Sequence, residues 1–430
     1  RKNANQIQAN QPIYQFGYHY NDDGNITQVD RPHTKYHYSY FPTGQLKTFS
    51  CDEMSLPVQY CPEDDQGNHI TDQTFDYDLS LNNLLSVDEN LKDKGDKTLT
   101  NQVQYGYTNS VNPVQLITYG NTNPAYPQQV TLNYDNEGDM TTDQGGNQLT
   151  YDGFDNLVKM TPSNQNATQG LITYGYDANG QQISETENGA DPLYFYYVQG
   201  SPIDEVQGSS INHYNSSGQV TNGQWQYYLQ DDRNNVISQM DDQGNITGFK
   251  TYLPFGYSHD LNPAPDNPVN KLLNIKALSK GYNGMLTDRM TGNQFLGNGY
   301  RAYNPLLRHF MKYDSASPFG KGGINGYAYV DNNPIMGFDP TGHMPKWLNY
   351  ALDGIGAFVA VGASIVLATF TGGSSLAAAG VYMSGALGVA SSGLNIAGTA
   401  TDNKALNKAS LYTGIAAGVV GLSGVANGIY

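Results

Sequence analysis

Two aspartates and one arginine are the residues most able to do chemistry together, as a centre that cuts peptides. Asp314 lies in KYDSASPFG, Asp339 in GFDPTGH and Arg301 in GYRAYN. Peptide hydrolysis by carboxylates needs one ionised base to activate water and one protonated acid to donate. Two neighbouring aspartates can share a proton because their like charges push one pKa up. An arginine beside them can tune an aspartate or hold an oxyanion.

Structural roles account for the same residues when they are taken alone. Asp-Pro-x-Gly is a common turn signal, and an Arg–Asp pair is more often a buried structural ion pair than a catalyst. Asp331 is a weaker alternative partner and is expected in a loop. The chain has no HExxH, phosphate-binding loop, Gly-x-Ser-x-Gly or dinucleotide fingerprint, and no Cys/His spacing typical of a metal. The sequence therefore predicts neither a cofactor nor a metal site.

The composition favours short strands joined by tight turns as the elements that position these residues. The chain of 430 residues has 48 Gly and 34 Tyr, and charged residues are only 14% of it. Average Gly usage is about 7%, so Gly is moderately enriched and Tyr strongly so. Tyr, Gly, Asn and Thr with few helix formers are typical of strands and turns. Helical periodicity is hard to find before residue 260.

A Tyr followed by a Gly four residues later recurs along the chain. Alternating residues before the turn suit a strand. Asp or Asn tolerates left-handed backbone, and Gly adopts it without steric cost. Each unit therefore predicts a β-hairpin, and stacked hairpins bury a shared stripe. The units pair Tyr20 with Gly24, Tyr40 with Gly44, Tyr134 with Gly138, Tyr176 with Gly180 and Tyr214 with Gly218, while Asp155 replaces the Gly after Tyr151 and a Met replaces the Tyr before Gly244.

These repeats and the stretch that follows them resemble the RHS family. YDNEG, YDANGQQI and YDGFDNL look like YD repeats, over roughly residues 14–255 with poor copies between 50 and 130. The stretch from Tyr252 to His343, with its TGNQFLGNGYRAYNP, SPFG, NPI and DPTGH steps, closely resembles the RHS-associated core. GNGYR and SPFGKGGINGYAYVDNNPI resemble the C components of bacterial insecticidal toxin complexes. Polymorphic RHS toxins of bacterial secretion systems share much of the pattern.

The resemblance implies a mainly β fold in which YD-repeat hairpins curl into a hollow shell. The expected domains are a shell over 1–255, an RHS core over 256–343 that closes one end, and a variable C-terminal tail over 344–430. The polar start of the chain, without Met, is expected to continue a longer protein. A B-type shell subunit or a missing N-terminal half is the expected partner, and the tail is the expected cargo. The resemblance further implies a protein of bacterial origin that is secreted or delivered to a target cell.

The resemblance also implies that the core cuts its own chain just after DPTGH. Arg301 and Asp314 occupy positions that match the family residues needed for this self-cleavage. Asp339 either takes part in the catalysis or shapes the turn that presents the bond. The cut is expected after His343 or Met344, and His343 stands where other members often have Leu. The implied activity is that of an aspartic-type autoprotease that acts once, on its own chain.

The charge balance and the cysteines limit the remaining possibilities. The net charge is −17, with −18 in residues 1–343 and +1 in residues 344–430. Because phosphate binding needs clusters of Lys and Arg, nucleic acid is not expected as the partner of these residues. Cys51 and Cys61 can form a disulfide, but the sequence leaves their pairing open.

The tail has a different character from the rest of the chain. Residues 354–401 contain no charged side chain, and small residues recur at four-residue spacing, as in Gly380, Ser384, Gly388 and Ser392. A membrane span needs about 20 apolar residues, and membrane helices pack closely through such small residues. The sequence predicts a helical apolar tail that is either cargo, a translocation segment or a membrane-active segment.

Three functions follow from these observations. The first is encapsulation and delivery of a toxic C-terminal polypeptide, released by self-cleavage after DPTGH. The second is a cell-surface protein that does not cleave itself, binds a glycan or a protein and is anchored by its tail. The third is a polymorphic RHS toxin whose tail forms a pore.

Overall fold

The computed structural model of the chain describes residues 16–343, with gaps, and residues 346–347. The gaps are 32–33, 54–60, 164–169, 199–200, 216–217, 222, 232, 242, 245, 259, 262–279, 289–290 and 321. The chain divides into two compact units, residues 1–345 and 346–430. The predictions for the tail, and for Met344 at the border, lie outside the described residues. No helix in the described part of the chain is long and apolar enough to span a membrane.

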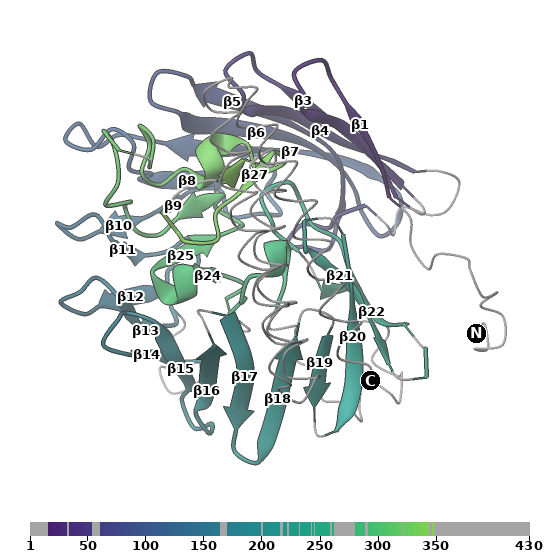
Figure 1. Cartoon of the computed structure of the whole chain (residues 1–430). Helices are drawn as coiled ribbons and strands as arrows, with labels where there is room; N and C mark the ends of the chain where they lie inside the picture. The colour runs from purple at the N-terminus through teal and green to yellow at the C-terminus, as the bar shows by residue number, and fades with distance from the viewer. Residues whose placement is uncertain are drawn as a thin grey trace, which may run out of the picture. The chain divides into compact units, whose positions relative to one another are not determined.

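The described residues of the first unit are mainly β, and they form two large antiparallel sheets in which each strand pairs with the next along the chain (Figure 1). The first sheet has nine strands and the second has fourteen. Only Leu132 separates β9 from β10, where the first sheet ends and the second begins, and its N–H donates to the carbonyl of Ile117. The strands therefore form one long meander with a break at Leu132.

The strand bounds follow the chain in order. The first sheet comprises β1 (Gly17–Tyr20), β2 (Ile26–Asp30), β3 (Thr34–Tyr40), β4 (Leu46–Glu53), β5 (His69–Asp78), β6 (Asn83–Lys92), β7 (Thr98–Gly106), β8 (Thr118–Asn121) and β9 (Val130–Thr131). The second sheet comprises β10 (Asn133–Tyr134), β11 (Met140–Thr142), β12 (Gln148–Tyr151), β13 (Leu157–Thr161), β14 (Ile172–Tyr176), β15 (Gln182–Glu187), β16 (Leu193–Val198), β17 (Ser201–Gln207), β18 (Ser210–Asn215), β19 (Gly218–Thr221), β20 (Gln224–Gln230), β21 (Val236–Asp241), β22 (Ile246–Lys250) and β23 (Asp260–Leu261).

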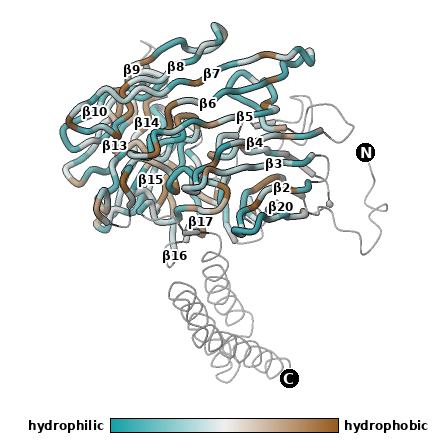
Figure 2. Tube along the Cα trace, turned by 90° about the horizontal axis from the view of Figure 1, so that it is seen from above, coloured by the Kyte–Doolittle hydropathy of each residue, from teal (hydrophilic) through white to brown (hydrophobic). Residues whose placement is uncertain are grey.

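Alternation of apolar and polar residues explains why one face of these strands is buried. In β5 the side chains of Phe75 and Tyr77 are buried, and the residues between and around them are more exposed. Successive side chains of a strand point to opposite faces, so such a pattern buries one face only. Figure 2 shows hydrophobic and hydrophilic residues interleaved along the strands.

The turns share one side-chain cap. The first Asp or Asn of the turn accepts hydrogen bonds from the backbone N–H groups two and four residues later, at 2.8–3.1 Å. The fourth residue has a positive φ, which favours Gly and then Asn or Asp. The capping residues are Asn21, Asp64, Asp93, Asp135, Asp143, Asp152, Asp177 and Asp231. The expected turn chemistry is thus present, including Asp155 in the place of Gly, at φ 58°.

Gly218 differs from its expected place in a turn. It is the first residue of β19 and pairs with Asn215, which leaves two residues between the strands rather than the five of a turn such as that between β14 and β15. A Cβ on Gly218 would lie 2.2 Å from the carbonyl oxygen of Gln226. Gly is needed there because the next strand approaches closely, and a shorter hairpin loop moves the Gly out of the turn.

A third segment, residues 280–343, packs against both large sheets (Figure 1, green). Tyr174 on β14 donates a 2.5 Å hydrogen bond to Asp288, and Arg308 reaches Glu89 on β6 at 3.1 Å. Its elements are η2 (Tyr282–Gly284), β24 (Gln294–Leu296), η3 (Gly297–Gly299), β25 (Arg301–Asn304), β26 (His309–Phe310), η4 (Tyr329–Asn332) and β27 (Gly337–Phe338), and β28 (Lys346–Trp347) belongs to the second unit.

A buried aromatic cluster fixes β25 within this segment. The ring of Tyr303 stacks on Tyr329 with centroids 4.4 Å apart and meets Phe310 edge-on at 5.4 Å. The Tyr303 hydroxyl donates to the carbonyl of Phe255 at 2.8 Å. Aromatic pairs of this kind stabilise a core beyond the burial of their area, so the strand that begins at Arg301 is held firmly.

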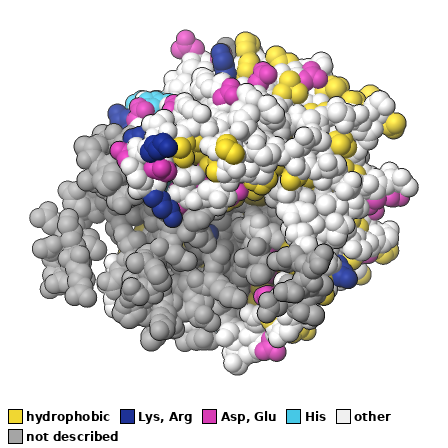
Figure 3. Space-filling model, turned by 180° about the vertical axis from the view of Figure 1, so that it is seen from behind, with side chains coloured by type: hydrophobic (Ala, Val, Ile, Leu, Met, Phe, Trp, Pro, Cys, Tyr) yellow, Lys and Arg dark blue, Asp and Glu magenta, His cyan; other side chains and the backbone are white. Residues whose placement is uncertain are grey.

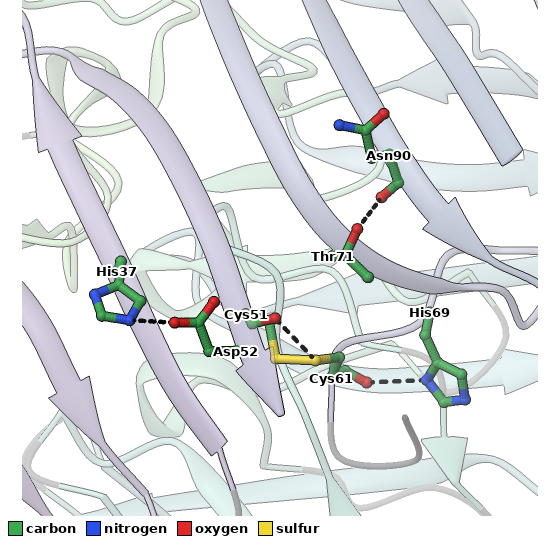
Figure 4. Close-up of a disulfide and its surroundings, with 7 residues drawn as sticks. All are labelled: His37, Cys51, Asp52, Cys61, His69, Thr71 and Asn90. Carbon is green, nitrogen blue, oxygen red and sulfur yellow. Dashed lines mark hydrogen bonds and ion pairs between the residues drawn. A yellow bond between two sulfur atoms is a disulfide. The ribbon is translucent and has the colours of Figure 1, made fainter. Parts of the chain in front are cut away.

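Cys51 and Cys61, whose pairing the sequence left open, form a disulfide (Figure 4). The bond joins the end of β4 to the chain just before β5, across a sequence separation of 10. Beside it, His37 pairs with Asp52 across β3 and β4 at 2.9 Å. The disulfide therefore fixes the long connection between two neighbouring strands of the first sheet.

Charged side chains are dispersed over the described part of the face in Figure 3. Acidic and basic groups lie among hydrophobic ones there, without a broad basic area on that described face. This distribution fits the acidic net charge of −17.

Candidate functional site

Arg301, at the start of β25, is the centre of a buried cluster of charges. Its side chain is 3% exposed, and those of Asp314 and Asp339 are 2% exposed. Arg301 Nη2 lies 3.1 Å from Asp314 Oδ2 and 3.6 Å from Asp339 Oδ2. One guanidinium nitrogen therefore reaches both carboxylates.

The remaining nitrogens of Arg301 hold the backbone around the two aspartates. Nε donates to the carbonyl of Gly342, and Nη1 donates to the carbonyl of Gly326 at 2.8 Å. The guanidinium carbon lies 3.6 Å from the ring centroid of Phe310, a cation–π contact. The guanidinium of Arg301 thus binds both carboxylates and also the end of the DPTGH segment.

The electrostatics of the cluster centre on the charge of Arg301. Burial lowers the pKa of Arg301, and the charges of Asp314 and Asp339 oppose that shift. An arginine stays protonated in proteins, so the cluster contains one fixed cation. Two buried carboxylates therefore lie beside a single fixed cation.

The turn around Asp339 is shaped by its own side chain and by a close glycine. The N–H and the hydroxyl of Thr341 both donate to Asp339 Oδ1, at 3.2 and 3.3 Å. Gly342 has φ +70°, in the left-handed region. A Cβ on Gly297 would lie 2.2 Å from the carbonyl oxygen of Thr341. Gly297 therefore allows η3 to lie against this turn.

Asp314 is held by backbone groups on both of its sides. Its N–H donates to the carbonyl of Gly326 at 3.1 Å, and its Oδ1 accepts from the N–H of Ala316 at 2.8 Å. Its carbonyl accepts from the N–H of Ser317 at 3.0 Å. These contacts hold the Asp314 carboxylate in place beside Arg301.

His343 also reaches the cluster. Its Nδ1 lies 3.3 Å from Asp314 Oδ1, and its ring stacks on Tyr300 with centroids 3.8 Å apart and planes inclined by 29°. Its N–H donates to the hydroxyl of Thr341 at 3.3 Å. The residue at the expected border is therefore anchored to Asp314 by its own side chain.

The structure brings together four of the residues singled out from the sequence, Arg301, Asp314, Asp339 and His343. Met344 lies outside the described residues. The alternative partner, Asp331, lies instead in η4, where its carboxylate lies against Gly323.

The sequence did not reveal the contacts that complete the cluster. The carbonyls of Gly326 and Gly342, the ring of Phe310 and the imidazole contact to Asp314 depend on how three distant stretches fold together. The one feature of the sequence that pointed to such a contact was His343, which stands where Leu is more usual.

The described residues hold no group of three or more His, Cys, Asp or Glu side chains placed to bind a metal ion. The chemistry that the cluster itself offers is that of coupled carboxylates: a base, an acid and a fixed cation.

Comparison with known proteins gives no matching family model. In sequence the chain resembles a tRNA3(Ser)-specific nuclease WapA of Bacillus spizizenii, with 30% identity over 232 residues, and a tRNA nuclease WapA of Bacillus subtilis, with 29% identity over 232 residues. These alignments cover 51% of this chain and 9% of each relative. The chain therefore spans about a tenth of the length of the curated relatives that it matches.

In structure the chain resembles part of the TcdB2-TccC3 toxin-complex chains. The crystal structure of TcdB2-TccC3-Cdc42 matches with a TM-score of 0.51 and 16% identity, over 76% of this chain and 18% of that chain. The crystal structure of TcdB2-TccC3 without its hypervariable C-terminal region matches with a TM-score of 0.50 and 17% identity, over the same shares. The chain therefore shares its fold over 76% of its length with a part of the toxin-complex chains, and it resembles a part of the WapA nucleases in sequence over 51% of its length.

Proposed function

We propose that the chain encloses and delivers a C-terminal toxic polypeptide, which it releases from its casing by cutting itself after DPTGH. The observation that carries this proposal is the single guanidinium of Arg301, which contacts Asp314, Asp339 and the carbonyl of Gly342. That arrangement brings two carboxylates close to the backbone of Gly342, in the DPTGH segment.

In the proposed reaction Asp314 is the base and Asp339 the acid. Ionised Asp314 takes a proton from a water molecule, whose oxygen adds to the carbonyl carbon of His343. The C–N bond to Met344 then breaks as Asp339 gives its proton to the leaving nitrogen. The products are a carboxyl group at His343 and a free amine at Met344. Asp314 receives the base role because its contacts to Arg301 and to the N–H of Ala316, at 3.1 and 2.8 Å, are shorter than those of Asp339.

The meander of hairpins is the proposed casing, with residues 1–255 as its wall and 256–343 as the core that closes it. Contacts from the 280–343 segment to both sheets support this role. The tail from Met344 onward is the proposed cargo. A B-type shell subunit, or further shell sequence joined to the N-terminus, would complete the enclosure. The relative solved without its hypervariable C-terminal region supports the idea of an exchangeable cargo.

A protein of bacterial origin that is exported or delivered to a target cell fits this proposal. The Cys51–Cys61 disulfide supports it, because disulfides persist mainly in oxidising compartments outside the cytosol. The tRNA cleavage named for the WapA relatives is not assigned to residues 1–343, whose acidic balance is unfavourable for phosphate binding.

The proposal is tested by comparing the wild-type chain with Asp314→Asn and Arg301→Ala in denaturing gels after purification. We expect two fragments in the wild type and one intact chain in each variant. Asp331→Asn is the matched control, since Asp331 lies against Gly323 rather than at Arg301, and we expect it to be cleaved like the wild type.

Enclosure of the tail is tested separately, by native size exclusion of the cleaved protein. Co-elution of the two fragments, and their separation only in denaturant, is expected if the casing retains the tail. Fragments that separate without denaturant would contradict enclosure while leaving self-cleavage intact.

A further inference from the structure

The side chain of His343 is the strongest feature of the site that the proposed reaction does not use. It belongs to the residue that contributes the carbonyl to the proposed scissile bond, and it contacts the proposed base directly. Other members of the family that the sequence resembles often have Leu at this place, which cannot make such a contact. The inference below rests on the proposed function and adds a regulation to the same site.

We propose that His343 is a positioning residue that makes self-cleavage depend on pH, with its imidazolium pairing with Asp314 and holding its own peptide in the site. In the protonated ring both nitrogens donate hydrogen bonds, so Nδ1, at 3.3 Å from Asp314 Oδ1, carries a proton and a charge toward the carboxylate. Cleavage is then fastest where His343 is protonated and slows where the ring is neutral.

The contact separates the roles of the two aspartates. Arg301 contacts both carboxylates, at 3.1 Å from Asp314 and 3.6 Å from Asp339, so its preference for Asp314 is small. His343 contacts Asp314. A positive charge on His343 therefore adds to the preference for Asp314 as the proposed base and Asp339 as the proposed acid.

Exposure makes His343 suited to respond to the medium. Its side chain is 41% exposed, whereas that of Asp314 is 2% exposed. A change of solvent pH can therefore alter the charge of His343, which lies in contact with the buried carboxylate of Asp314. Stacking on Tyr300 at 3.8 Å keeps the ring in place in both of its protonation states.

Several other charged or titratable groups lie near the ring of His343. Tyr300 stacks on the ring of His343. The Nζ of Lys312 lies over the Tyr300 ring, 4.9 Å from its centroid. Asp339 is linked to the backbone of His343 through the hydroxyl of Thr341, and Arg301 contacts the carbonyl of the preceding residue, Gly342. Asp139 lies near Lys312, and burial raises its pKa to about 7, so Asp139 changes its charge in the same pH range.

The test is a pH profile of cleavage for the full 430-residue chain. The chain is made in a short cell-free pulse, translation is stopped, and aliquots are diluted into buffers between about pH 5.5 and 8.5, the range in which an ordinary histidine changes charge. The fraction cleaved is followed with time on denaturing gels. Three variants are compared with the wild type: His343→Gln, which keeps a hydrogen-bond donor without a charge, His343→Leu, which has neither, and the control Asp139→Asn.

We expect the wild-type rate to fall roughly fivefold as the pH rises through this range, the scale of one partly exposed ion pair. His343→Gln and His343→Leu should both be cleaved without this fall, and Asp139→Asn should keep the wild-type profile. A wild type that cleaves at the same rate throughout, or a His343→Gln chain that keeps the fall, overturns the inference and leaves the proposed function standing. A wild type that stays intact at every pH overturns both.

Discussion

Arg308 is a buried charge whose partners, Glu89 and Tyr105, lie about 200 residues earlier in the sequence. Its Nη2 lies 3.1 Å from Glu89 Oε1, and its Nη1 donates to the Tyr105 hydroxyl at 2.5 Å. Burial alone would lower the pKa of Arg308, but Tyr105 and Glu89 raise it above its ordinary value. The pair therefore links the 280–343 segment to β6 and β7.

Replacement of Arg308 by Ala should destabilise the first unit by about 3–5 kcal/mol, because Glu89 is left as a buried charge without its cation. The measurement is the free energy of unfolding in denaturant. Lys35→Ala is the matched control: Lys35 is 37% exposed and lies 3.7 Å from Asp30, so its loss should cost less than about 1 kcal/mol. Equal costs for the two variants would show that the Arg308 pair is not the link described here.

The hairpin turn is the element in which local sequence and structure agree most closely. Asp152 Oδ1 accepts from the N–H groups of Phe154 and Asn156, at 2.8 and 3.0 Å, and Asp155 follows at a positive φ. A short polar side chain and a residue that tolerates left-handed backbone suffice to define such a turn. The same chemistry recurs at Asp135 and Gly138 and at Asp177 and Gly180.

Two of these turns differ in what surrounds them, and this difference yields a prediction. Gly24 and Gly138 both have positive φ, 79° and 92°. A Cβ on Gly24 meets no atom within 4 Å, whereas one on Gly138 would lie 2.9 Å from the Tyr327 hydroxyl. That hydroxyl donates to the carbonyl of Gly138 at 2.7 Å.

Gly24→Ala should cost about 1–2 kcal/mol of unfolding free energy, the strain of a left-handed Ala. Gly138→Ala should cost about 1 kcal/mol more, because it also displaces the Tyr327 hydrogen bond. Both values come from denaturant unfolding of the purified variants. A Gly138→Ala cost no larger than that of Gly24→Ala would mean that the 280–343 segment does not depend on this contact.

The sequence predicted features that depend on adjacent residues better than contacts between distant stretches of the chain. Turns such as those at Gly24 and Gly180 depend on four or five adjacent residues, so their spacing predicted them. The place of Gly218 depends on how closely β20 approaches, which adjacent residues do not specify. The contacts of Arg301 with the carbonyls of Gly326 and Gly342 likewise arise only when distant stretches meet.

At the scale of the whole chain, the two sheets and the 280–343 segment form one compact unit that ends at Pro345. The structural relatives cover 76% of this chain. A unit of this kind built from consecutive hairpins depends on every connection that holds neighbouring strands in register. The connection closed by the Cys51–Cys61 disulfide is the longest between neighbours at the start of the first sheet.

Removal of that disulfide should weaken the first unit. The double variant Cys51→Ser, Cys61→Ser should lose about 3 kcal/mol of unfolding free energy, since the short loop gains conformational freedom in the unfolded state. Denaturant unfolding with and without a reducing agent measures this. The reducing agent should lower the stability of the wild type to that of the variant and leave the variant unchanged. Reduction without effect on the wild type would contradict a stabilising disulfide.

The proposed self-cleavage is tested by the intact mass of the purified chain under denaturing conditions. We expect two polypeptides whose masses sum to that of the chain plus one water and whose division lies between His343 and Met344. A single polypeptide of about 47 kDa would contradict it, because the Arg301 cluster would then be a structural ion network that holds the DPTGH turn in place.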